Sequence, residues 1–92
     1  MGTILIQGVR YVRLSELPKG ITAVVSRVDD AHQADPIAQR LRDLGFVAGE
    51  PIRVVGNGPL GADPLLIRIG STRFALRRSE AARVMVDEEV AA

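Results

Sequence analysis

The segment from residue 65 to residue 76 constrains the fold more than any other part of this sequence. Two runs, LLIRI (65–69) and TRFAL (72–76), have the alternating pattern typical of β-strands. Only Gly70 and Ser71 separate them, and this pair suits a type II′ turn. Such a short loop fixes the pairing as Ile69 with Thr72, Arg68 with Arg73, Ile67 with Phe74, Leu66 with Ala75 and Leu65 with Leu76. Leu65, Ile67, Phe74 and Leu76 then share one apolar face, which a one-residue slip would destroy.

Further short strands are predicted on both sides of this hairpin. Residues 9–14 and 51–55 are strand candidates, and Pro51 is tolerated because it stands at the start of its run. Residues 21–28 are rich in β-branched side chains and apolar on both faces, which favours a central strand. A last short strand is expected at 84–86, followed by a frayed tail at 87–92.

One short helix is well marked over about 36–44. Asp35 is placed to cap it, Pro36 suits its first position, and Gly45 suits the left-handed residue that ends it. The spacing predicts a buried stripe and an outward face. The stripe is Ile37, Leu41 and Leu44, and the outward residues are Gln39, Arg40, Arg42 and Asp43. A second helical turn is expected near 79–83, capped by Ser79.

These elements predict a mainly β fold, a small and partly open SH3-like barrel with one inserted helix. With 92 residues, 47% of them hydrophobic, the chain is expected to form a single domain. Its core is expected at 14–86, with 1–13 as an N-terminal extension. The apolar stretch near the N-terminus is too short for a signal peptide or a membrane span, so a cytoplasmic protein without direct membrane insertion is expected.

Residues 56–61, GNGPLG, have the G-x-G-x-x-G spacing of dinucleotide-binding loops. That function needs a helix directly after the glycines, because the pyrophosphate binds to the free N–H groups of the helix. Here Pro64 and an alternating strand follow, and Pro59 removes an N–H donor from the loop. The segment is therefore interpreted as a hairpin loop rather than a coenzyme site.

Catalytic and metal sites have little support. The chain has no cysteine, its carboxylates are scattered, and no serine or threonine nucleophile accompanies its single histidine, so no catalytic residue is predicted. The candidate ligands for a divalent cation such as Fe2+ or Zn2+ are His32, Asp29, Asp30 and Asp35. Their spacing matches no specific ligand pattern. The alternative is a solvated connection that ends by capping the helix.

Arg68 opposite Arg73 is an unusual pairing, and Arg77 continues the series two positions beyond Ala75. Like charges in directly opposed positions destabilise a hairpin. Either nearby acids such as Glu50 or Glu80 neutralise them, or the face binds an anion or a protein partner. A proline-rich peptide is disfavoured as the ligand, because the chain has one Tyr, two Phe and no Trp to line a groove.

Four segments, taken in order, resemble the FeoA family. They are LSELPKG (14–20), RLRDLGFVAGEPIRVV (40–55), GPLGADPLLIRI (58–69) and RFALRRSEAARVMV (73–86). The resemblance implies an SH3-like barrel without enzymatic activity or a required cofactor, acting on FeoB, a membrane permease with a cytosolic GTPase domain. Two features depart from the family pattern. Ala62 is inserted into the usual Pro-Leu-Gly-Asp-Pro loop, and the first residues extend beyond the usual start.

The loop at 58–64 contains two prolines and two glycines, so it can hold Leu60 at its tip in one shape. The alternative is that Leu60 folds back onto the barrel. The predicted partner-binding residues come from this loop and from the arginine face. They are Pro59, Leu60, Gly61, Asp63, Pro64, Arg68, Arg73 and Arg77.

The favoured function is that of an accessory or regulatory protein of bacterial ferrous iron uptake. It would act on the cytosolic part of a FeoB-like permease and be peripheral to the inner membrane through this partner. An alternative is an SH3-like nucleic-acid- or ribosome-associated module that uses Arg68, Arg73, Arg77 and Arg78, although a net charge of +1 argues against nucleic acid. A further alternative is a divalent metal sensor. Assembly into a homo-oligomer is left open.

Overall fold

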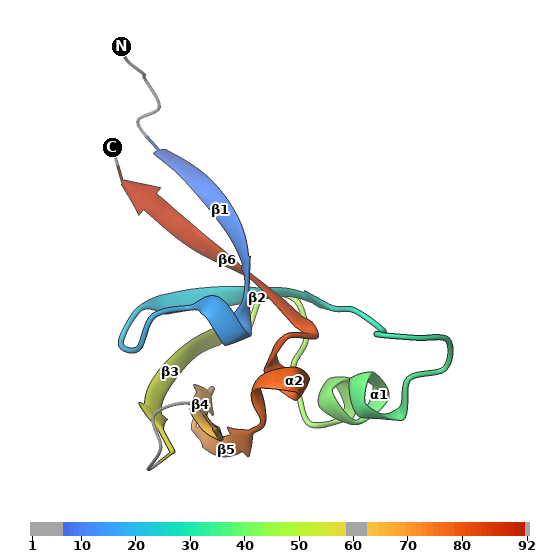
Figure 1. Cartoon of the computed structure of the whole chain (residues 1–92). Helices are drawn as coiled ribbons and strands as arrows, with labels where there is room; N and C mark the ends of the chain where they lie inside the picture. The colour runs from blue at the N-terminus through green and yellow to red at the C-terminus, as the bar shows by residue number, and fades with distance from the viewer. Residues whose placement is uncertain (1–6, 59–62, 92) are drawn as a thin grey trace.

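The computed structural model describes residues 7–58 and 63–91 (Figure 1). The elements of this part of the chain follow one another as β1 (Gln7–Arg13), the 3-10 turn η1 (Leu14–Glu16), β2 (Thr22–Val28), α1 (Pro36–Asp43), β3 (Pro51–Asn57), β4 (Leu65–Ile69), β5 (Thr72–Leu76), α2 (Arg78–Ala81) and β6 (Val84–Ala91). The predicted mainly β fold with one inserted helix and a second short helical turn is confirmed.

The strands form one antiparallel sheet in the order β1-β6-β2-β3-β4-β5. β2 lies inside the sheet, as its β-branched sequence predicts. The register shifts between Val25 and Arg27 of β2 and between Val54 and Gly56 of β3. Such irregularities increase the local twist, and the sheet curls around its core while β1 and β6 extend away as a two-stranded arm (Figure 1).

The hairpin of β4 and β5 has the predicted register at all five pairs, from Leu65 opposite Leu76 to Ile69 opposite Thr72. Gly70 takes a positive φ of 59° and Ser71 does not, which is the pattern of a type II′ turn. The expectation that a strand rather than a helix follows the G-x-G-x-x-G segment is also confirmed. β3 runs on through Asn57, and the next element is β4 rather than a helix.

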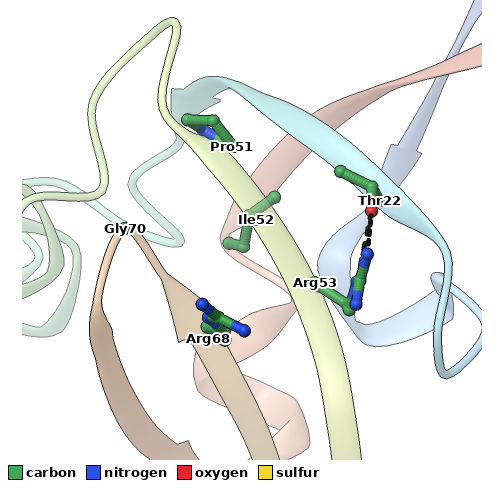
Figure 2. Close-up of a pocket in the computed structure, with 6 residues that line it drawn as sticks. All are labelled: Thr22, Pro51, Ile52, Arg53, Arg68 and Gly70. Atoms are coloured by element: carbon green, nitrogen blue, oxygen red, sulfur yellow. Dashed lines mark hydrogen bonds between the residues drawn. The ribbon is translucent and has the colours of Figure 1, made fainter.

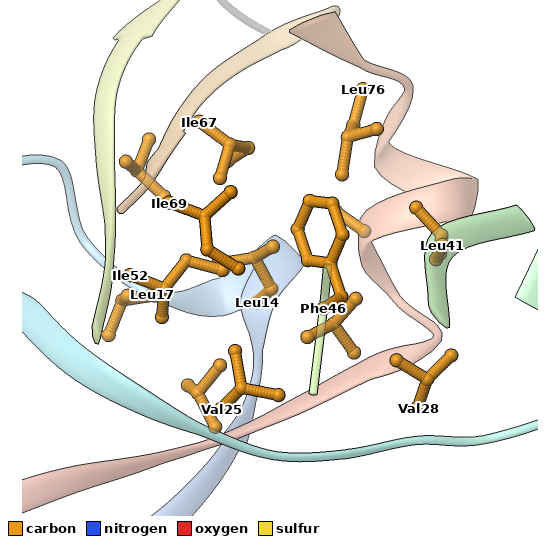
Figure 3. Close-up of a cluster of buried hydrophobic side chains, with 14 of the residues drawn as sticks. Leu14, Leu17, Val25, Val28, Leu41, Phe46, Ile52, Ile67, Ile69 and Leu76 are labelled. Carbon is orange, nitrogen blue, oxygen red and sulfur yellow. The ribbon is translucent and has the colours of Figure 1, made fainter. Parts of the chain in front are cut away.

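The core is enclosed by the curled sheet, α1 and α2 (Figure 3). Phe46, in the loop after α1, is 1% exposed and is the largest of the fully buried side chains. Its ring centroid lies 5.7 Å from that of Phe74, which packs against the core from β5. Ile67 of β4 and Leu14 of η1 are completely buried beside them. The apolar face predicted for the hairpin is therefore part of the core.

The first residue of α1 was predicted correctly and its last residue to within one position, but its buried side was not predicted correctly. Asp35 caps the helix and Gly45 follows it with a φ of 110°. Leu41 is buried, whereas Leu44 is 38% exposed and the small Ala38 is buried in its place. The prediction for Leu44 is wrong because the helix ends at Asp43, and α1 contacts the core through the side that carries Ala38 and Leu41.

Two further predictions need correction. The N-cap residue of α2 is Arg77, whose N–H donates to Glu80 Oε1 at 2.8 Å, so Ser79 does not cap this helix. Residues 87–91, expected to be a frayed tail, continue β6 and pair with residues 7–11 of β1. The segment expected as an N-terminal extension thus supplies the strand partner that orders the other end of the chain.

Candidate functional site

The base of the predicted partner-binding loop is closed by backbone contacts. Pro59, Leu60 and Gly61 of the prediction lie outside the described residues. At the base, the Gly58 N–H donates to the Pro64 carbonyl at 2.7 Å. A Cβ on Gly58 would come within 2.0 Å of the Asp63 carbonyl oxygen, so only glycine fits at this position.

Asp63 ties the loop base to α2. Its Oδ1 accepts a hydrogen bond of 2.6 Å from the Arg78 N–H, at the first residue of the helix. Because the first N–H groups of a helix have no partner within the helix, this carboxylate supplies one and favours the helix electrostatically. Asp63 and Pro64 also line a surface hollow of about 330 Å3 together with Ala75, Arg77 and Glu80. Three predicted partner-binding residues, Asp63, Pro64 and Arg77, therefore lie around one hollow.

The other predicted residues belong to a row of arginines across three strands. Arg68 of β4 pairs with Arg73 of β5 on one side and with Arg53 of β3 on the other. All three side chains are exposed on the outer face of the sheet. We call Arg53, Arg68 and Arg73 the arginine row. Arg77, in contrast, follows the end of β5 and lies at the loop base.

Arg53 was missed by the sequence interpretation. The alternation of residues 51–55 already places it on the outer face of its strand. Its position beside Arg68 depends on the β3–β4 register, which shifts by one residue between Val54 and Gly56. A loop of several residues does not determine that register, whereas the two-residue turn between β4 and β5 does.

No acid forms an ion pair with the arginine row within the described part of the chain. The ion pairs there involve five other arginines, and neither Glu50 nor Glu80 takes part in any of them. Arg53 Nη2 donates to the Thr22 hydroxyl at 2.7 Å, which holds the guanidinium without cancelling its charge (Figure 2). A hollow of about 290 Å3 lies between Arg53 and Arg68, lined also by Thr22, Pro51, Ile52 and Gly70.

The aspartates named as metal ligands are engaged by arginines instead. Asp29 accepts hydrogen bonds of 2.8 Å from both Arg13 and Arg27, and these contacts lower the pKa of its carboxyl. Asp30 accepts from Arg42 Nη2 at 2.8 Å, and the same Nη2 donates to the Val28 carbonyl. Arg42, predicted to face outward, is thereby half-buried.

Asp35 is the most strongly held of these carboxylates. Its Oδ2 accepts from Arg83 Nε at 2.6 Å and from the Ala31 N–H, and its Oδ1 accepts from the Ile37 N–H. The hydrogen bond from Arg83 holds the pKa of Asp35 well below its ordinary value, against the opposing effect of burial. His32 is exposed, with its Nε2 3.8 Å from Asp35 Oδ1. Among the described residues, no three His, Asp or Glu side chains are grouped so as to hold a metal ion.

The described residues also include no helix that is both long enough and apolar enough to cross a bilayer.

Comparison with known proteins agrees with this fold. The FeoA domain family matches residues 12–88. The chain belongs to the FeoA family. A curated relative, the Fe(2+) transport protein A/Fe(2+) transporter FeoB fusion protein of Porphyromonas gingivalis, is 40% identical to it over 76 residues. That match covers 83% of this FeoA chain but only 8% of the much longer fusion protein.

Solved FeoA structures have the same architecture. A zinc complex of Stenotrophomonas maltophilia FeoA, described as an SH3 domain protein, is 56% identical, with a TM-score of 0.77. The alignment covers 85% of this chain and 94% of that one. The FeoA protein of Chlorobium tepidum is 36% identical with a TM-score of 0.70, over 84% of this chain and 70% of that one. The predicted SH3-like fold is confirmed.

Proposed function

We propose that this FeoA protein is a non-enzymatic accessory protein of ferrous iron uptake that acts on the cytosolic part of a FeoB-type permease by protein–protein contact. The P. gingivalis fusion protein carries the proposal, because it joins a FeoA segment and a FeoB transporter in one polypeptide. Joining two modules raises the effective concentration of each for the other. Fusion in one organism therefore supports association of the separate proteins in another.

The contact surface that we assign comprises the loop at 58–64 together with three arginines, Arg68, Arg73 and Arg77. Its residues are Pro59, Leu60, Gly61, Asp63, Pro64, Arg68, Arg73 and Arg77. Two observations support it. The loop base is closed by the Gly58–Pro64 hydrogen bond and anchored to α2 through Asp63, and an ordered base lowers the entropy lost on docking. The adjoining hollow offers a site into which a partner side chain can insert.

The proposal places the protein in the cytosol, at the inner membrane only through its partner. It includes no metal cofactor, since the carboxylates near His32 are directed at arginines and backbone N–H groups. A bound cation would have to displace those contacts.

Affinity purification from the native cells tests the proposal. The chain, tagged at one end, is expected to recover a FeoB-type permease from detergent-solubilised membranes, and deletion of its gene is expected to reduce uptake of radiolabelled Fe(II). The Leu60→Asp variant should fold and yet fail to recover the permease. Leu44→Asp is the matched control, because Leu44 is an exposed leucine at the end of α1. Loss of recovery in both variants, or recovery of no permease by the unaltered chain, would refute the proposed contact.

A further inference from the structure

We infer that the arginine row is a docking surface for an acidic α-helix of a protein partner, which lies across β3, β4 and β5. The inference rests on the proposed function in taking the partner to be a protein. It goes further in stating the charge, the conformation and the orientation of the segment that binds.

The charge arrangement of the chain points to an external anion. Each of five other arginines has an acid partner within the chain, in the pairs Arg10–Glu88, Arg13–Asp29, Arg27–Asp29, Arg42–Asp30 and Arg83–Asp35. The arginine row instead holds three like charges in directly opposed positions, an arrangement that destabilises a sheet. A carboxylate-bearing partner would offset this repulsion on binding.

The spacing of the row is compatible with a helix that lies across the strands. Neighbouring strands lie about 4.8 Å apart, so the Cα positions of the three arginines span about 10 Å from first to last, and their diverging guanidinium groups span about 12 Å. Carboxylates on one face of a helix recur once per turn, about every 5.4 Å, and three of them span about 11 Å. Side chains on one face of an extended strand recur about every 6.7 Å, so three of them span about 13 Å. The choice of a helix therefore rests on the apolar residues that flank the row.

The surroundings of the row favour an amphipathic helix. On one side, Leu66 is 36% exposed between the small residues Gly56 and Ala75, to which it pairs across the sheet. On the other side, the exposed Pro51 pairs with Val24, which is 38% exposed. Apolar side chains thus flank the row, and the hollow between Arg53 and Arg68 is open to a carboxylate (Figure 2).

Nucleic acid fits this face less well. Binding to phosphates without sequence preference needs a clear basic excess, and the chain carries a net charge of only +1. Single strands also need aromatic side chains on which bases stack. Phe74, the aromatic residue in the three strands that carry the row, packs against the core.

The test uses three synthetic peptides of 18 residues and the folded chain. The first is a helical peptide with glutamates on one face and leucines beside them. The second has glutamine in place of glutamate, and the third has the same composition with its glutamates scattered around the helix. Binding is measured by fluorescence anisotropy at low and at physiological salt. The first peptide is expected to bind most tightly, and raising the salt should weaken its binding because the charges are exposed.

Matched variants connect this binding to the row. Arg68→Gln and Arg53→Gln should each weaken binding of the first peptide by about threefold, the scale of an exposed ion pair. Arg40→Gln, an equal loss of charge on the exposed side of α1, should leave binding unchanged. Equal affinity for all three peptides, or equal losses in all three variants, would overturn the inference. Tighter binding of a 12-nucleotide RNA would overturn it as well.

The outcomes also separate this inference from the proposed function. If the permease is recovered equally by the wild type and by a variant in which Arg53, Arg68 and Arg73 are all changed to Gln, the row is not the docking surface, and the proposed association with the permease rests on the loop residues alone. If no permease is recovered while the acidic helix binds selectively, the docking surface stands and its protein partner is a different one.

Discussion

Removal of the central charge of the arginine row should stabilise the folded protein. Arg68 has an arginine directly opposite on each side, Arg53 and Arg73, while Arg73 has such a neighbour on one side only. The row contains no compensating acid among the described residues, so neutralising Arg68 removes two repulsions and breaks no ion pair. We therefore expect Arg68→Gln to raise the free energy of unfolding.

The size of the gain follows from Coulomb's law. Strands about 4.8 Å apart, with long side chains that diverge, place neighbouring guanidinium groups about 6 Å from one another. The Arg53 guanidinium is held toward Thr22, on the side away from Arg68, so the repulsions calculated from this distance are upper values. Each repulsion in water then amounts to about 0.7 kcal/mol before screening. With two neighbours and Debye screening, Arg68→Gln should gain about 1 kcal/mol at 10 mM salt, about 0.6 at 0.15 M and about 0.2 at 1 M. Arg73→Gln should gain about half as much at each salt concentration.

Urea unfolding followed by circular dichroism at these three salt concentrations measures the gain. Arg40→Gln is the control, because it removes the same charge from an exposed position on α1 without an ion-pair partner in the described chain. A gain that is independent of salt, or equally large in the control, would refute the repulsion. A loss of stability at low salt would mean that Arg68 stabilises the fold, and this would remove the main reason for assigning it a partner.

Three further predictions concern the fold that supports this surface. Asp35→Asn should lower the urea midpoint at pH 7 because it leaves the Arg83 guanidinium without its carboxylate. The pKa values of Asp35 and Asp29 are lower in the folded chain than in the unfolded one, so their stabilisation is present above about pH 4 and is lost as pH falls below it. The difference between Asp35→Asn and the wild type should therefore shrink at pH 3, and a constant difference would contradict the ion pair. Phe46→Ala should cost about 3 to 5 kcal/mol in urea unfolding, and a cost below about 1 kcal/mol would mean that the cavity collapses. Gly70→Ala should lower stability by about 1 kcal/mol, since alanine is strained at a φ of 59°, and an unchanged midpoint would contradict this turn geometry.

The parts of the fold that were predictable are those set by local signals. The two-residue turn at Gly70 fixes the β4–β5 register, and Asp35 and Gly45 mark the ends of α1. The order of residues 87–91 was missed because their partners lie in β1, almost the full length of the chain away. No local pattern reports such a pairing, since its stability comes from a contact that forms only in the folded sheet.

In the candidate site too, the features set by local signals were predictable and those set by distant contacts were not. Arg68 and Arg73 were paired from the sequence because a tight turn joins their strands. Arg53 joins them only through the β3–β4 ladder, whose register shifts between Val54 and Gly56. The hydrogen bond from the Arg78 N–H to Asp63 could not be predicted either. The two residues are fifteen positions apart, and nothing in the sequence of the loop indicates that its carboxylate accepts from the first residue of a helix.

The loop base and the arginine row belong to one surface because β4 connects them. Pro64, at the base, precedes the first residue of this strand, and Arg68 is its fourth residue, so the two lie about 13 Å apart along an extended chain. An interface of ordinary size covers about 800 Å2 on each partner, enough to span that distance in both directions. A single protein can therefore contact the loop and the arginine row at once. The charged row would then contribute mainly to its rate of association, and the apolar loop to its rate of release.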